Sequence, residues 1–140
     1  MSAPQGPDVL IVDDHEDTRD SLSALLSMYG YSAVTVEDAR NAFGLLQTGL
    51  RPRMILVDLN MPTLSGWGFC SMLAAEPDLY NIPVAIITGA DEYRGVPYRA
   101  VDAGVFRKPL DLDALVSAVE KTIGKKAAGF VPARPHSRIS

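Results

Sequence analysis

Three carboxylates at the ends of two apolar segments are the residues of this chain whose chemistry is most informative. Asp13 and Asp14 follow the run Val9–Val12, and Asp58 follows the run Met54–Val57. Because the carboxyl ends of parallel strands lie along one edge of a sheet, where ligands bind, we expect the three carboxylates to meet there. Three carboxylates this close cannot all stay ionised without a cation, and oxygen donors favour Mg²⁺ or Mn²⁺. The pattern therefore predicts a divalent metal site.

Two further polar residues end apolar segments of the same kind. Thr88 follows the run Val84–Ile87, and Lys108 follows the short segment Val105–Arg107 and precedes Pro109. At the same edge of a parallel sheet, their hydroxyl and ammonium groups would be suitable partners for an added anion. Together with the carboxylates and a bound metal ion, they indicate phosphoryl transfer onto a carboxylate.

Apolar periodicity predicts strands and helices that alternate along the chain. Strands are expected at Asp8–Asp13, Ser32–Val36 and Met54–Asp58, after Pro83, and near Val105–Arg107. Helical spacing marks five segments: Leu22–Tyr29, Ala39–Leu46, Trp67–Leu73, the weaker Tyr98–Ala103, and Leu112–Ile123. This alternation implies right-handed βαβ crossovers, and hence an α/β fold with a doubly wound parallel sheet that helices cover on both faces.

Helix ends can also be predicted from the sequence. Asp17 or Thr18 is expected to cap the first helix, and Asp111 the last one, because short polar side chains satisfy the free N–H groups of a first turn.

The composition is that of one small domain outside the membrane. A chain of 140 residues, 47% of them hydrophobic, is long enough for one core, and no apolar stretch approaches the ~20 residues that span a bilayer. The start of the chain has neither a basic segment nor an apolar one, so no secretory signal is expected. The single cysteine, Cys70, excludes an intrachain disulfide and suits a reducing cytoplasm.

Charge is distributed unevenly along the chain. The first 123 residues hold 9 basic and 17 acidic residues, a balance of −8, and the remaining 4 basic residues bring the total to −4. An acidic body is a poor nucleic-acid binder, so no direct contact with nucleic acid is expected. Residues 1–7 are interpreted as a flexible N-terminus and residues 124–140 as a disordered basic tail or the start of a linker, which leaves 8–123 as the domain.

Four short motifs resemble those of one known family. They are Val12-Asp13-Asp14, then Asp58-Leu59-Asn60-Met61-Pro62 with Gly66, then Thr88-Gly89-Ala90, and finally Lys108-Pro109. In this order, each at the end of a predicted strand, they resemble the receiver domain of bacterial two-component response regulators over residues 8–123, with a single-domain chemotaxis regulator as the nearest type. The resemblance implies a flavodoxin-like five-stranded sheet in the order 2-1-3-4-5, flanked by five helices.

The resemblance also implies a role for each acidic position. Asp58 matches the phosphoacceptor, whose carboxylate becomes an acyl phosphate. Asp14 matches the residue that binds Mg²⁺ directly, and Asp13 its neighbour that acts mainly through water. The backbone carbonyl of Asn60 would be a further metal ligand. His15 follows the acidic pair, but the oxygen ligands of the family argue against a metal role for it.

Lys108 and Thr88 match the family residues that respond to the phosphoryl group. Lys108 would neutralise its charge, Thr88 would donate a hydrogen bond to it, and the bond before Pro109 is expected to be cis. The phosphodonor would be a sensor histidine kinase or a phosphotransfer protein, and the domain would catalyse its own phosphorylation and dephosphorylation. The sequence does not identify the downstream protein partner.

One departure and two alternatives accompany the resemblance. The family usually carries an aromatic residue where this chain has Val105, and the neighbouring Phe106 should face the other side of the sheet. One alternative is a degenerate receiver that binds proteins without being phosphorylated. The other is a phosphatase or phosphotransferase with an aspartyl-phosphate intermediate, but such enzymes usually have a second Asp where this chain has Asn60.

Overall fold

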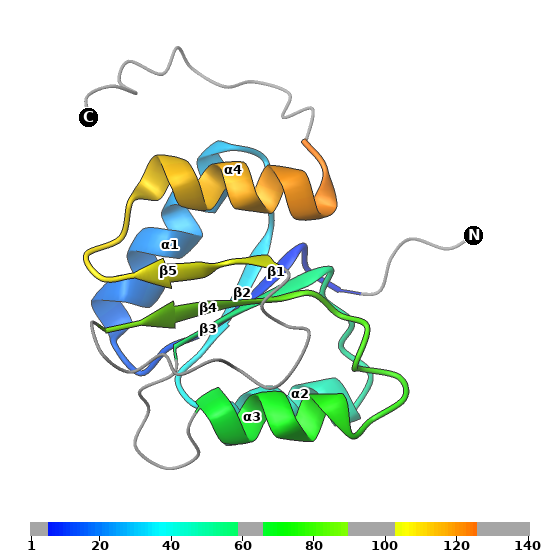
Figure 1. Cartoon of the computed structure of the whole chain (residues 1–140). Helices are drawn as coiled ribbons and strands as arrows, with labels where there is room; N and C mark the ends of the chain where they lie inside the picture. Colours follow the sequence, from blue (N-terminus) through cyan, green and yellow to red (C-terminus); the bar gives the residue numbers. More distant parts are fainter. Residues whose placement is uncertain (1–5, 59–65, 90–102, 126–140) are drawn as a thin grey trace.

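Five parallel strands form the centre of the molecule (Figure 1). The computed structural model describes residues 6–58, 66–89 and 103–125. The strands are β1 (Val9–Val12), β2 (Ala33–Val36), β3 (Met54–Asp58), β4 (Val84–Thr88) and β5 (Val105–Arg107), and they lie in the order β2-β1-β3-β4-β5. The predicted doubly wound sheet and its strand order are confirmed.

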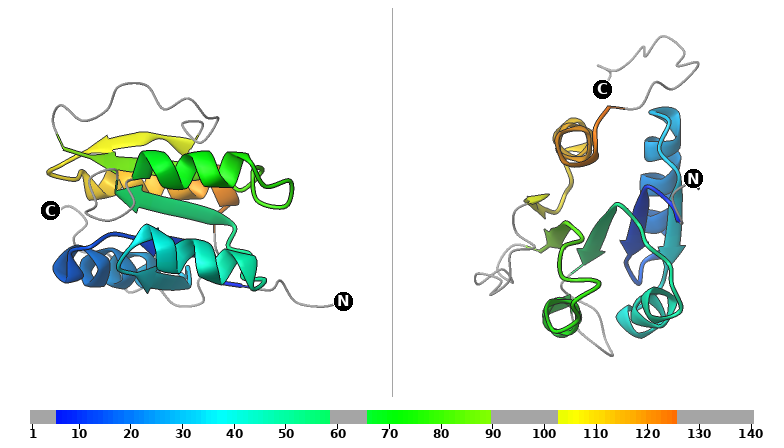
Figure 2. Two further views of the ribbon diagram at one scale, coloured as in Figure 1. Left: turned by 90° about the horizontal axis from the view of Figure 1, so that it is seen from below. Right: turned by 90° about the vertical axis from the view of Figure 1, so that its right-hand side faces the viewer.

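Helices cover both faces of this sheet. They are α1 (Glu16–Met28), α2 (Ala39–Gln47), α3 (Gly66–Ala74) and α4 (Leu112–Ile123). In Figure 2 the helices α1 and α4 lie on one face of the sheet, and α2 and α3 lie on the other. These are the helices of the described residues, and the fifth helix expected near Tyr98–Ala103 falls almost wholly outside them. None of the helices that the structure describes is long and apolar enough to cross a membrane.

The core is divided into two layers by the sheet. Every residue of β1, β3 and β4 is buried, as expected for strands covered on both faces. Side chains alternate between the layers, so that Leu10 and Val12 pack with residues of α2 and α3, whereas Val9 and Ile11 pack with residues of α1 and α4. This alternation holds the strands in a single register, because a shift of one residue would reverse their buried faces.

The register aligns the carboxyl ends of the central strands. Val12 pairs with Val57, and Asp58 pairs with Ile87 on the next strand. Thr88 in turn pairs with Arg107, the last residue of β5. The residues that follow these strands therefore start from one edge of the sheet.

Helix α1 begins earlier than the sequence suggested. Its N-cap is His15, which makes no side-chain capping bond, and Asp17 lies inside the first turn. The prediction that Asp17 or Thr18 caps this helix is wrong, and Asp17 instead complements the positive end of the helix dipole. In α4, by contrast, the side chain of Asp111 accepts a hydrogen bond from the Ala114 N–H at 3.1 Å, as predicted.

The predicted opposition of Val105 and Phe106 is confirmed. Val105 packs against the core layer of α2 and α3, and Phe106 packs against the layer of α1 and α4. Gly104 has a φ of 120°, and a Cβ at this position would lie 2.9 Å from the Phe106 ring. A glycine is therefore needed before β5 both for the backbone conformation and for the placement of the Phe106 ring.

Candidate functional site: an acidic cluster at the carboxyl edge of the sheet

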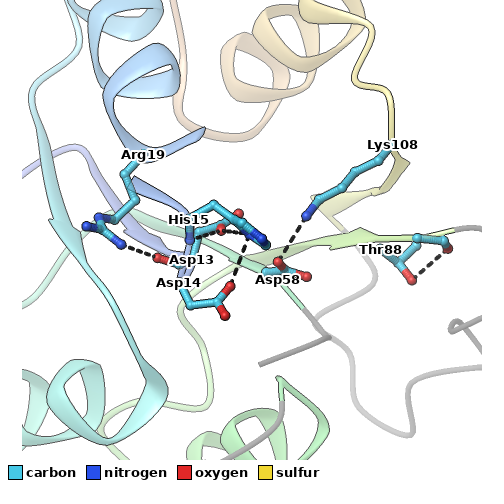
Figure 3. Close-up of polar contacts among 8 residues, drawn as sticks. Asp13, Asp14, His15, Arg19, Asp58, Thr88 and Lys108 are labelled. Carbon is cyan, nitrogen blue, oxygen red and sulfur yellow. Dashed lines mark hydrogen bonds and ion pairs between the residues drawn. The ribbon is translucent and has the colours of Figure 1, made fainter. Parts of the chain in front are cut away.

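Carboxylates from two strand ends meet at the carboxyl edge of the sheet (Figure 3). Asp13 and Asp14 follow β1, and Asp58 is the last residue of β3. One ligand atom from each of these residues and one ring nitrogen of His15 all lie within 4.8 Å of one another. The side chains of Asp13 and Asp58 are almost completely buried, at 0% and 1% exposure, whereas that of Asp14 is 31% exposed. We refer to these four residues as the acidic cluster.

Lys108 supplies a positive charge to the acidic cluster. Its Nζ lies 3.1 Å from Asp58 Oδ2, and its backbone N–H donates to the Thr88 carbonyl at 3.0 Å, which holds β5 beside β4 at this point. The bond between Lys108 and Pro109 is cis, as predicted. Burial alone would lower the pKa of Lys108, but the hydrogen bond with Asp58 and the charges of Asp58, Asp13 and Asp14 outweigh burial and raise this pKa above 10.5. Lys108 therefore stays cationic at neutral pH.

Asp13 has one carboxylate oxygen with a partner and one without. Its Oδ1 accepts the His15 backbone N–H at 2.8 Å. Its Oδ2 is buried and, among the buried side-chain nitrogen and oxygen atoms of the described residues, it alone lacks a hydrogen-bond partner. A buried polar atom without a partner costs free energy, so this oxygen marks a position where a cation or a bound group would be stabilising.

Two further residues contact Asp13: Arg19, which had no role in the sequence analysis, and His15, for which a metal role was weighed and not favoured there. Arg19 donates from Nη1 to the Asp13 carbonyl at 2.8 Å, which fixes the backbone at the start of the acidic cluster. Arg19 places a positive charge near the N-terminal end of α1, which is unfavourable for the helix dipole. This unfavourable position is the sign in the sequence that Arg19 makes a specific contact. His15 places Nδ1 at 3.2 Å from Asp13 Oδ1 and 3.1 Å from Asp14 Oδ1.

Thr88 lies at the neighbouring strand end, but its hydroxyl is not directed to the acidic cluster. The side chain is completely buried, and Oγ1 donates to the Gly89 carbonyl at 3.1 Å (Figure 3). The hydroxyl must leave this bond to reach a group on Asp58. Asn60, predicted to provide a carbonyl ligand, lies outside the described residues.

The residues present fit a hard divalent ion. Three carboxylates share a small volume, one buried carboxylate oxygen has no partner, and Lys108 compensates only part of the charge. Oxygen donors of this kind match the ligands that Mg²⁺ prefers.

Comparison with known proteins assigns the chain to a family. A model of the family described as the response regulator receiver domain matches residues 9–120. The probable transcriptional regulator ycf27 of Guillardia theta is 34% identical over 124 residues, which is 85% of this chain and 47% of that protein. The response regulator MprA of Mycolicibacterium vanbaalenii is 32% identical over 139 residues, 94% of this chain and 58% of that protein. The chain thus spans about half the length of these relatives.

Solved structures agree with this assignment. The signal receiver domain of a histidine kinase from Syntrophus aciditrophicus superposes with a TM-score of 0.73 at 30% identity, covering 84% of this chain and 90% of that one. The chemotaxis response regulator CheY4 of Vibrio cholerae gives a TM-score of 0.71 at 25% identity, covering 82% of this chain and 97% of that one. Together with the strand order and the acidic cluster, these similarities show that the chain belongs to the response regulator receiver domain family of two-component signalling.

Proposed function

We propose that the chain receives a phosphoryl group on Asp58 from a sensor histidine kinase or a phosphotransfer protein. The observation that supports this most is the environment of Asp58: a carboxylate with 1% exposure, paired with Lys108 at 3.1 Å, in the same cluster as the partnerless Oδ2 of Asp13. This combination provides a nucleophile, a cation for the transferred group and a place for a metal ion. In our proposal Asp13, Asp14, Asp58 and the Asn60 carbonyl hold Mg²⁺, or Mn²⁺ in its place.

The proposed reaction is an in-line displacement at phosphorus. An oxygen of Asp58 forms the new P–O bond while the P–N bond to the donor histidine breaks, and the electron pair of that bond returns to the imidazole. Lys108 is already beside Asp58 and positively charged, so it stabilises negative charge on the transferring group without rearrangement. Mg²⁺, when bound, would neutralise further charge on the phosphoryl oxygens. The domain thereby assists its own phosphorylation. In the later dephosphorylation a water oxygen would form a bond to phosphorus while the P–O bond to Asp58 breaks, which releases inorganic phosphate and restores the Asp58 carboxylate.

Phosphorylation would then act on the conformation through Thr88 and Lys108. The phosphoryl group adds acceptor oxygens next to Asp58, and the Thr88 hydroxyl can exchange its bond with the Gly89 carbonyl for a bond with one of them. Lys108 would keep its contact with the enlarged acidic group. The new bond of Thr88 and the retained contact of Lys108 would draw the ends of β4 and β5 toward β3 and shift the domain between two conformations, which a protein partner can distinguish.

The proposal also covers the limits of the domain, the cellular compartment and the kind of partner. Residues 8–123 would form the switch domain. Pro7 is buried and the Gly124 carbonyl accepts the Tyr31 hydroxyl at 2.6 Å, so the proposed flexible extensions would begin outside these two residues. The buried free thiol of Cys70 fits a reducing compartment, and we propose the cytoplasm. The relative named a probable transcriptional regulator is about twice as long as this chain, so a role in transcription is not carried over to it. We propose that this chain acts through contact with another protein.

Intact-mass measurement tests the proposal directly. The protein is incubated with Mg²⁺ and acetyl phosphate or phosphoramidate, and we expect a gain of one phosphate that is absent from Asp58→Asn. Asp38→Asn is the matched control: it makes the same change at the partly exposed cap of α2, where Asn is an equally good cap, and should leave the mass gain intact. A gain that persists in Asp58→Asn would contradict the assignment. A folded wild-type protein that gains no mass from these donors or from a phosphorylated kinase would favour the degenerate receiver.

A further inference from the structure

His15 lies where a ligand of the metal would lie. Its Nδ1 is 3.2 Å from Asp13 Oδ1 and 3.1 Å from Asp14 Oδ1, and Figure 3 shows its ring directed toward the carboxylates. The side chain is 63% exposed, so burial in the core does not dictate this orientation. It also makes no capping bond to α1, although His15 is the N-cap residue. The contacts with the two carboxylates are therefore the interactions that hold the ring.

These distances match the spacing of ligands around one ion. In an octahedral site with metal–ligand bonds of about 2.1 Å, neighbouring ligand atoms lie about 3.0 Å apart and opposite ones about 4.2 Å apart. The separations of Nδ1 from the two carboxylate oxygens, 3.2 and 3.1 Å, are close to the neighbouring value. The ligand atoms of the whole cluster lie within 4.8 Å of one another, so a contraction of about 0.6 Å at most would bring them to the spacing of ligands on one ion.

The partnerless Oδ2 of Asp13 is an independent indication that this cluster holds a ligand. Asp13 Oδ1 already accepts the His15 backbone N–H, which leaves Oδ2 as the buried oxygen without a partner. The same backbone contact keeps His15 next to Asp13. The residue that orients the buried carboxylate therefore also brings a ring nitrogen to it.

We infer that His15 contributes a nitrogen ligand to the metal site and shifts its preference from Mg²⁺ toward Mn²⁺. This inference rests on the proposed function only in assuming that the acidic cluster binds a divalent ion. Mg²⁺ prefers oxygen ligands, whereas imidazole suits the first-row transition metals, whose affinity for nitrogen donors exceeds that of Mg²⁺. A site of three carboxylates and one imidazole should therefore bind Mn²⁺ more tightly, relative to Mg²⁺, than a site of carboxylates alone.

In the alternative arrangement, the ring contacts the carboxylates only when no metal is bound, through hydrogen bonds at Nδ1. In that arrangement His15 would compete with every divalent ion in the same way. Its removal would then strengthen the binding of Mg²⁺ and Mn²⁺ by equal factors and leave their ratio unchanged. The ratio of the two affinities therefore separates a ligand from a competitor.

Calorimetric titration of Mg²⁺ and Mn²⁺ into the full chain tests the inference. For His15→Phe, which removes the nitrogen ligand and breaks no capping bond, we expect the preference for Mn²⁺ over Mg²⁺ to fall by about 10-fold, which corresponds to about 1.4 kcal/mol. His136→Phe, which changes the second of the two histidines, should keep the wild-type ratio. Circular dichroism would establish that both variants are folded.

Pulsed electron paramagnetic resonance of bound Mn²⁺ gives a second measurement. We expect modulation from one coordinated ¹⁴N nucleus in the wild type and in His136→Phe, and none in His15→Phe. An unchanged Mn²⁺ to Mg²⁺ ratio in His15→Phe, or an absence of ¹⁴N modulation in the wild type, would overturn the inference while leaving the metal site in place. If neither ion binds to the wild type, or binding survives in Asp14→Ala, the proposed metal site itself fails.

Discussion

The two edges of the sheet use the same residue types in opposite ways. At the amino edge, Asp8 precedes β1, and its carboxylate accepts the Ser32 N–H at 2.9 Å and the Ser32 hydroxyl at 3.3 Å, with Arg53 Nη1 at 3.5 Å. At the carboxyl edge, Asp13 follows β1 and keeps a buried oxygen without a partner. Both aspartates are buried and lie at the ends of one strand, yet only one of them has its acceptors satisfied.

The amino edge also anchors the end of the last helix. Arg53 donates from Nη2 to the Ile123 carbonyl at 2.7 Å, and the Tyr31 hydroxyl donates to the Gly124 carbonyl at 2.6 Å. These bonds satisfy carbonyl groups that a helix leaves free at its C-terminal end. The polar network of the amino edge therefore contributes to stability. The carboxyl edge gathers like charges at a cost in stability, and this is the pattern expected of a functional site.

The largest difference between the edges should be in metal affinity. Asp14→Ala removes the carboxylate that we propose binds the ion directly, and we expect it to weaken Mg²⁺ binding by more than about 100-fold, beyond the range typical of groups that only support a ligand. Asp8→Asn, at the other edge, should change the affinity less than about twofold, because distant and independent sites do not couple. Titration of Mg²⁺ by calorimetry, supported by the fluorescence of the single tryptophan, Trp67, would measure both. Equal effects of the two changes would remove the distinction between the edges.

For the free energy of unfolding, we expect the larger loss from a change at the amino edge. Asp8→Ala leaves the Ser32 N–H and hydroxyl without their acceptor and removes the partner of Arg53, so it should destabilise the protein by about 2 kcal/mol. Urea unfolding would show this as a lower midpoint with an unchanged slope. A loss below about 0.5 kcal/mol, the usual size of a surface effect, would mean that the network of the amino edge does not stabilise the fold.

Truncated chains test which C-terminal residues contribute to the stability of the amino edge. A chain that ends at Lys125 keeps the bonds to the Ile123 and Gly124 carbonyls, and its melting temperature should stay within about 4 °C of the full chain. A chain that ends at Thr122 loses both bonds and the buried Ile123 side chain, and should melt clearly lower. If the Lys125 truncation also melts much lower, residues beyond 125 pack on the domain, and the proposed flexible tail is wrong.

The smallest effect concerns the pH dependence of the Asp58–Lys108 pair. The pKa of Lys108 is raised in the folded protein, so its stabilising contribution is complete below the unfolded value of 10.5 and is lost as the pH rises through the folded value. The difference in unfolding free energy between the wild type and Lys108→Met should therefore stay constant from about pH 6.5 to 9 and decrease only above 10.5. A difference that declines already near neutral pH would show that Lys108 is not held as a cation.

The sequence was sufficient to predict the strands and their ends, because buried parallel strands are short apolar runs and polar residues mark where they stop. Asp58 and Thr88 end such runs, and the register brings them to one edge. The opposite orientations of Val105 and Phe106 also followed from the period of two residues in a strand.

The parts of the site that escaped prediction depend on contacts that leave no periodic pattern. Asp13 Oδ1 accepts the His15 N–H, and α1 begins at Glu16, earlier than the cap expected at Asp17. The hydrogen bond from Arg19 to the Asp13 carbonyl joins residues six positions apart, and it forms only in a specific conformation of the Arg19 side chain. The direction of the Thr88 hydroxyl likewise depends on its local backbone, since it donates to the next carbonyl rather than to the acidic cluster.

Urea unfolding of the wild type, Asp13→Asn and Asp8→Asn, each with and without Mg²⁺, tests the contrast between the two edges most directly. Without Mg²⁺, Asp13→Asn should be more stable than the wild type, because it removes one buried charge from the cluster, and Asp8→Asn should be less stable. Saturating Mg²⁺ at about 100 times its dissociation constant should stabilise the wild type and Asp8→Asn by about 2.7 kcal/mol and Asp13→Asn by much less. An Asp13→Asn variant that is less stable than the wild type without Mg²⁺, and that gains as much from the ion, would contradict the account.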